Sequence, residues 1–269
     1  MRGTSLWRRL VVAGFVLLGL GAAVLGLSSH AGSGNALVAV GVFLGQLLAV
    51  ALLVIGFGAV VSQSIWGFAL SSRNAYSLSK MQMAGWTVLV LAALFTAAEL
   101  RIFGYFGAAK DPLDITIPGD LLAAMGIAIF TTAATPAVLA LKADSKPSEA
   151  QAAAAAQRLA DQTRTTPDNI KSMGHVMVRT EQSLARWSDI ISGDEVANAG
   201  TVDLSKVQQL LITMLLLVAY GGMMVSAIIH QDPLASLPAL SPSFIGLLAI
   251  SHAGYLTYKA MPKPAPADR

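Results

Sequence analysis

The 269-residue chain contains no cysteine. This absence excludes disulfide bonds, thiolate metal sites and cysteine-based catalysis. The four histidines are scattered through the sequence at positions 30, 175, 230 and 252, without the spacing of a zinc site. We therefore expect no bound metal.

Charge is also scarce. Only 12% of the residues are charged, about half of the ~25% of an ordinary soluble domain, whereas 55% are hydrophobic and the mean hydropathy is +0.63. No Asp, Glu, Lys or Arg lies between Arg9 and Arg73. The composition predicts an integral membrane protein and excludes a soluble enzyme, a disordered chain and a nucleic-acid-binding protein, despite a pI near 9.3.

Motifs for catalysis are missing as well. The chain has no Walker loop, no dinucleotide-binding glycine pattern and no His-Glu-x-x-His. Asp194, Glu195 and Asp203 do not have the spacing of an EF-hand, and no serine lies in a nucleophile elbow. We expect no catalytic residue, no cofactor and no enzymatic activity.

What the sequence does contain is a series of uncharged stretches long enough to cross a bilayer, which needs ~20 apolar residues per helix. They predict an all-α fold, a polytopic membrane bundle of about six transmembrane helices, near Trp7–Leu27, Ala36–Val61, Met83–Phe103, Gly119–Leu141, Gln209–Ile229 and Leu240–Ala260. The first also resembles a secretory signal, but its apolar run is longer than the usual ~7–15 residues and favours a retained helix.

The positions of the basic residues predict the orientation. Sixteen of the 18 Lys and Arg residues would lie on one side of a six-span bundle, and only Arg101 and Lys110 on the other. Basic residues accumulate in cytoplasmic loops. We therefore expect a multi-pass protein of the bacterial inner membrane, with both termini and the segment from Lys142 to Lys206 in the cytoplasm.

An internal repeat links two parts of the chain. The segment from Trp66 to Gln82 matches the segment from Trp187 to Gln208, and Asp111-Pro112-Leu113 matches Asp232-Pro233-Leu234. Both copies enter the membrane from the same side, so the repeat is parallel. The predicted organisation is an N-terminal helix pair over 1–65, a first repeat over 66–142, a cytoplasmic linker and helix over 143–192, a second repeat over 193–262 and a tail over 263–269.

The shared Leu-Ser-Lys-x-Gln element begins one helix of each copy. Its serines can cap the helix, its lysines can extend to lipid phosphates, and its glutamines would face the bundle one turn inside. The predicted membrane-surface anchors are Lys80, Gln82, Lys206 and Gln208.

This element and the ending LAISHAGYLTYK (248–259) resemble a group of bacterial integral membrane proteins of unknown activity that carry paired LSKxQ and LLxISxxGYLxYK segments. The resemblance extends from about Trp187 to Lys259, and more faintly from Trp66 to Lys142. It implies an integral membrane location and no particular activity.

Several polar residues lie within the predicted spans. His252, beside Ser251, lies about 15 Å along its helix, near the middle of a ~30 Å hydrocarbon core, and Thr131, Thr132 and Thr135 lie at a similar depth. They could line a path for water, protons or a small solute. Alternatively, His252 could donate one hydrogen bond to a neighbouring helix while the threonines bond carbonyls of their own helix. Glu99 lies near the outer boundary, where it is either solvated at the interface or at the mouth of an ion pathway.

The cytoplasmic segment begins with an alanine-rich stretch, which we interpret as a linker or a marginal helix. After Pro167, apolar residues recur every three or four positions and predict an amphipathic helix. Its apolar stripe consists of Ile170, Met173, Met177, Leu184, Trp187 and Ile191. Such a helix could lie on the inner leaflet, cover the bundle or pair with a partner helix.

The sequence is compatible with two functions. One is a non-catalytic, oligomeric scaffold or anchor that presents the predicted amphipathic helix to a cytoplasmic helical partner, as a homo-oligomer or as a subunit of a membrane assembly. The other is a small channel or facilitator lined by the polar residues. The lipid bilayer is a partner in both, and nucleic acid in neither.

Overall fold

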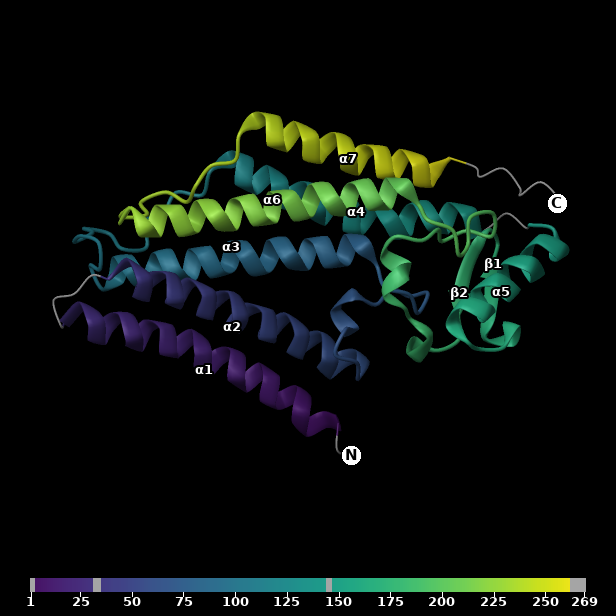
Figure 1. Ribbon diagram of the computed structural model, residues 1–269, viewed down its shortest axis with the longest axis horizontal. Helices are drawn as coiled ribbons and strands as arrows, with labels where there is room; N and C mark the ends of the chain where they lie inside the picture. The colour runs from purple at the N-terminus through teal and green to yellow at the C-terminus, as the bar shows by residue number, and fades with distance from the viewer. Residues whose placement is uncertain (1–2, 31–34, 144–146, 262–269) are drawn as a thin grey trace. The chain divides into compact units, whose positions relative to one another are not determined.

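The computed structural model describes residues 3–30, 35–143 and 147–261 (Figure 1). Its long helices are α1 (Gly3–His30), α2 (Ala36–Ser62), α3 (Leu78–Ile102), α4 (Gly119–Ala143), α6 (Leu204–Ile229) and α7 (Pro242–Ala260). The remaining regular elements are the shorter helix α5 (Glu149–Thr163), the strands β1 (Ile170–Met173) and β2 (Val176–Arg179), and four 3₁₀ turns.

The predicted fold, an all-α helical bundle, is confirmed. Five helices, α1, α2, α3, α4 and α6, are long and apolar enough to cross a membrane. Helix α7 forms where the sixth span is predicted, but it is not among these five. The chain is therefore a helical bundle of the membrane-protein class.

The chain divides into two compact units. Unit 1 comprises Met1–Phe68, Ala84–Met125 and Met214–Ile245, and unit 2 comprises Ala69–Met83, Gly126–Thr213 and Gly246–Arg269. Helices α3, α4, α6 and α7 contribute residues to both units.

In unit 1, helices α1 and α2 form a close antiparallel pair (Figure 1). Glycines make this approach possible. A Cβ atom on Gly14 would lie 2.9 Å from the Ala49 carbonyl oxygen, and one on Gly56 would lie 3.1 Å from the Val11 nitrogen. Larger residues at these positions would force the helices apart, because backbone atoms cannot move aside as a side chain can.

The loops of unit 1 are held by one cation. Arg101, at the end of α3, donates to the carbonyls of Asp111, Pro112 and Asp114 at 2.9–3.1 Å. The loops that precede α4 and α7 also pair directly, because the Thr116 nitrogen donates to the Ala235 carbonyl at 2.9 Å. The Arg101 side chain thus donates to loop carbonyls that have no partner in a helix or strand.

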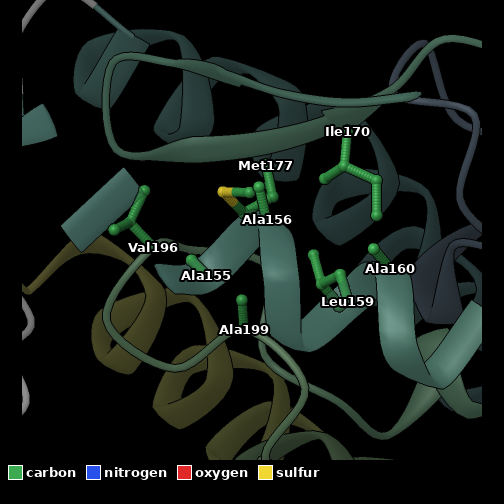
Figure 2. Packing of buried hydrophobic residues seen from close by; sticks show 8 residues of the cluster. All are labelled: Ala155, Ala156, Leu159, Ala160, Ile170, Met177, Val196 and Ala199. Atoms are coloured by element: carbon green, nitrogen blue, oxygen red, sulfur yellow. The ribbon is translucent and has the colours of Figure 1, made fainter. Parts of the chain in front are cut away.

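Unit 2 contains a small polar module, residues 147–203, built around α5. The helix begins at Ser148, whose hydroxyl accepts from the Gln151 nitrogen at 3.3 Å. Of the two predicted alternatives for the alanine-rich stretch, a linker or a marginal helix, the structure has a helix, and this helix is packed rather than marginal. Its buried face packs against the strands and the loop that follows, in a cluster formed by Ala155, Ala156, Leu159, Ala160, Ile170, Met177, Val196 and Ala199 (Figure 2).

The predicted amphipathic helix over 170–191 is also wrong. Its first ten residues form an antiparallel hairpin in which Ile170 pairs with Arg179 and Met173 with Val176, and the rest contains two 3₁₀ turns. Gly174 lies at the hairpin turn with φ +55°, a conformation that favours glycine. The β-branched residues Val176 and Val178 favour a strand over a helix.

Both faces of the hairpin carry apolar residues, and this explains why apolar residues three and four positions apart suggested a helix. Ile170 and Met177 contribute to the core cluster against α5, whereas Met173, Val176 and Val178 line a cavity on the opposite face. Both faces therefore need apolar residues. Of the remaining stripe, Trp187 is exposed, and Leu184 and Ile191 are half-buried in or beside the 3₁₀ turns.

Candidate functional site

A buried polar cluster in unit 2 brings together residues of four helices. His252 of α7 is 2% exposed. Its Nδ1 lies 2.7 Å from the Thr131 hydroxyl of α4 and 3.2 Å from the Gln209 amide nitrogen of α6. The histidine and threonine predicted to lie at the same depth thus form a direct hydrogen bond.

The other two threonines face α3 instead. The Thr132 hydroxyl is 2.9 Å from the Ser79 carbonyl and 2.9 Å from that of Ala128, and the Thr135 hydroxyl is 3.2 Å from that of Ser79. Like Thr132, Thr135 also reaches a carbonyl of its own helix, at Thr131. Hydrogen bonds between helices and to α4 itself therefore satisfy these hydroxyls.

One predicted glutamine lies in the cluster and the other does not. The Gln82 amide donates to the Thr213 hydroxyl at 2.8 Å and to the Gln209 carbonyl at 3.1 Å. Gln208 is exposed, so the prediction that it faces the bundle is wrong. Its neighbour Gln209 is fully buried, because one residue further along a helix points about 100° around the axis.

The cluster also contains polar atoms without a hydrogen-bond partner among the described residues. They are His252 Nε2, Ser251 Oγ, Gln82 Oε1 and Gln209 Oε1. Buried polar groups normally have a partner, and ordered water often supplies it. The cluster therefore has four positions at which water or a small polar solute could bond.

A second site, the Asp194 cluster, comprises Asp194, Arg73, Lys206 and Lys259. Arg73 Nη2 and Lys206 Nζ each lie 2.9 Å from Asp194 Oδ1, and Lys259 Nζ contacts Oδ2. Lys259 also donates to the Tyr255 hydroxyl at 2.9 Å. The cluster thus joins the segment before α3, the polar module, the start of α6 and the end of α7.

This site is strongly unbalanced in charge. Three cations share one carboxylate whose side chain is 9% exposed. Burial by itself would raise the pKa of Asp194, but Arg73, Lys206 and Lys259 outweigh that effect and hold the pKa well below its usual range. The neighbouring pairs, Arg179 with Asp189 and Lys142 with Glu195, are each neutral overall.

Neither predicted lysine anchor lies free at the surface. Lys206 is buried, and besides Asp194 its ammonium donates to the Ser192 carbonyl at 2.6 Å. It is therefore not a lipid-facing anchor as predicted, because its charge is held inside the protein. The half-buried Lys80 donates to the Leu70 carbonyl at 2.6 Å.

Sequence analysis missed Arg73, Asp194 and Lys259. The signal that pointed to them was the concentration of basic residues at the predicted cytoplasmic helix ends, beside a short acidic loop. That signal gives no pairing, because the three residues are far apart in the chain.

A cavity of about 750 Å³ lies beside these residues in unit 2. Its polar wall includes Ser71, Arg73, Ser77, Lys80, Thr132 and Thr135. The apolar wall comes from the last turns of α4, from Pro136 to Ala143, and from the hairpin. His252 and Ser251 do not line it.

Comparisons with known proteins add no further assignment. No family model, curated protein or solved structure matches the chain. The function must therefore be argued from the geometry of the sites themselves.

Glu99 lies apart from the other predicted residues, in unit 1. Both of its carboxylate oxygens accept from the Gln46 amide, at 2.8 and 2.9 Å. The same amide also lies 3.3 Å from the Leu18 carbonyl of α1. The carboxylate is thus held between membrane helices. Within the described part of the chain, no group of three or more His, Asp or Glu side chains could hold a metal ion.

Proposed function

We propose that the chain is a non-catalytic scaffold of the bacterial inner membrane, which anchors a folded cytoplasmic module at the membrane surface. The observation that carries this proposal is the Asp194 cluster. It ties the polar module to the chain entering α3, to α6 and to α7 by ion pairs that are nearly buried. Such a module is fixed in place and can hold a partner in a defined orientation.

The membrane topology belongs to the same proposal. Six spans, with α7 as the sixth, account for the distribution of 18 basic residues. The parallel repeat is supported by local structure, since Leu78 begins α3 and its counterpart Leu204 begins α6. A 3₁₀ turn also follows Trp66 and begins at Trp187. We propose that the resemblance to bacterial membrane proteins with these paired segments reflects this shared arrangement.

Co-purification from native membranes tests the scaffold. The wild-type chain should retain a cytoplasmic partner or further copies of itself, and Asp194→Asn should lose the partner because the module is released. Asp168→Asn, which changes an exposed carboxylate of the module, is the matched control. A partner retained equally by Asp194→Asn would contradict the proposal.

The second candidate is a facilitator for water, protons or a small polar solute. It is favoured by the buried atoms of the His252 cluster that have no partner among the described residues. Flux into liposomes should then change on His252→Ala and on Thr131→Val, with Ala137→Val as an exposed control on the same helix. Unchanged flux in both cluster variants would exclude this function.

A further inference from the structure

The cavity beside the Asp194 cluster has an excess of positive charge. Arg73 and Lys80 line it, and none of its lining residues is acidic. The single carboxylate behind Arg73 is shared with Lys206 and Lys259. Four cations therefore surround this region with one anion between them, and unpaired charge near a low-dielectric interior is costly.

The Lys80 ammonium has donors left for an anion. Its ammonium has three donors, and the Leu70 carbonyl takes one of them at 2.6 Å. Within the described chain no carboxylate lies within ion-pair distance of it. Ser77 also lines the cavity, and its hydroxyl could donate to an anionic oxygen as well.

The cavity also has an apolar part. This apolar wall is formed by Pro136, Leu139, Ala140 and Leu141 of α4 together with Val176 and Val178 of the hairpin. Helix α4 is one of the five apolar helices, and Leu141 is 78% exposed. The apolar wall therefore reaches the exposed surface of an apolar helix.

A cavity lined by cations, hydroxyls and aliphatic side chains fits an amphiphile. Its volume of about 750 Å³ lies within the ~300–1,000 Å³ typical of small-molecule sites. We propose that it binds an anionic phospholipid, with the phosphate at Arg73 and Lys80 and an acyl chain along the last turns of α4. A free phosphate would use only the charged wall and leave the apolar wall exposed.

Thermal unfolding of the delipidated full chain in detergent tests this proposal. Phosphatidylglycerol should raise the unfolding midpoint more than phosphatidylcholine with the same acyl chains, and inorganic phosphate should not raise it. Lys80→Met should increase the half-saturating concentration of phosphatidylglycerol about fivefold, from the contribution of one basic residue at an anionic surface. Lys80→Arg, which keeps the charge, should restore the affinity.

Two matched tryptophan variants test the apolar wall independently of the ion pairs. Ala140 and Ala137 are both exposed on α4, but only Ala140 lines the cavity. Ala140→Trp should abolish the shift with phosphatidylglycerol, and Ala137→Trp should retain it. Both positions are exposed, so a larger side chain is tolerated at either one. The two tryptophan variants therefore still test the proposal if Lys80→Met fails to fold.

Three results would overturn the proposal. Equal shifts with phosphatidylglycerol and phosphatidylcholine would show that charge is not recognised. Retention of the shift in Ala140→Trp would show that the lipid binds elsewhere. A shift with inorganic phosphate that persists in Ala140→Trp would assign the cavity to a free anion.

Discussion

Asp194 is the residue on which the polar end of unit 2 depends. Removing one cation from the cluster still leaves Asp194 with two partners, whereas removing the carboxylate leaves Arg73, Lys206 and Lys259 buried together without an anion. Breaking a buried ion pair is costly because the remaining charge keeps its desolvation penalty. At this site the penalty applies to three cations at once.

Asp194→Asn should therefore lower the free energy of unfolding by ~3–5 kcal/mol. The measurement is chemical unfolding of the purified protein in detergent. Asp168→Asn, an exposed carboxylate of the same module, should change the free energy by less than ~0.5 kcal/mol. Equal stability of the two variants would mean that the cluster does not hold the module.

The effect of Asp194 should also depend on pH in a defined direction. Its pKa in the folded protein is below the unfolded value, so its contribution is present above the unfolded pKa of ~3.9 and is lost as pH falls through the folded pKa. The stability difference between wild type and Asp194→Asn should be constant from about pH 5 to pH 8 and shrink below about pH 4. A difference that changes near neutral pH would require another titrating group.

Among the elements, the hairpin turn at Gly174 lies close to the end of α4. A Cβ atom at this position would lie 2.4 Å from the carbonyl oxygens of both Lys142 and Ala143, and the residue has φ +55°. Space and backbone conformation both require glycine.

Gly174→Ala should destabilise the protein by more than ~1–2 kcal/mol, the cost of the left-handed conformation alone. Gly254 is the matched control, because it lies in helix α7 and a Cβ atom there would meet nothing within 4 Å. Gly254→Ala should be neutral or stabilise by up to ~1 kcal/mol. Thermal unfolding of the two variants should show shifts that differ in sign or by several degrees, and equal shifts would contradict the role of the turn.

The long elements could be predicted because their signal is local. Helices α2 and α4 begin at Ala36 and Gly119, as predicted from uncharged runs and turn residues. The hairpin could not, because residues buried on both faces of a strand erase the alternation that identifies it. The local signals against a helix were Gly174, which interrupts the helical pattern, and the β-branched residues Val176 and Val178.

How well each site could be predicted also depends on whether its signal is local. The contact between His252 and Thr131 follows from counting depth along two helices. The burial of Gln209 instead of Gln208 depends on helix rotation, which an apolar run does not define. The Asp194 cluster depends on tertiary folding, since its four residues come from four separate segments.

At the scale of the whole molecule, the lack of cysteine becomes an experimental advantage. The native chain has no thiol, so one introduced cysteine reports the side of the membrane on which it lies without background labelling. Ser172, in β1 of the polar module, and Lys110, in the loop before α4, are both exposed.

Lys110→Cys should react with a membrane-impermeant thiol reagent in spheroplasts, which expose the outer face of the inner membrane. Ser172→Cys should react only after the membrane is permeabilised, because the distribution of basic residues predicts that the module lies in the cytoplasm. Both should react in detergent. Labelling of Ser172→Cys in intact spheroplasts would reverse the proposed orientation, and labelling of both would contradict the six-span topology.

The Asp194 cluster finally constrains the order of events during synthesis. Asp194 emerges from the ribosome before α6 and α7, and Lys259 follows nearly all of α7. The cluster cannot be complete until Lys259 has been synthesised, even though α5 and the hairpin can already pack on each other (Figure 2). Until then the Asp194 carboxylate lacks one of its three cations, so the module of an incomplete chain is held less firmly than that of the finished protein.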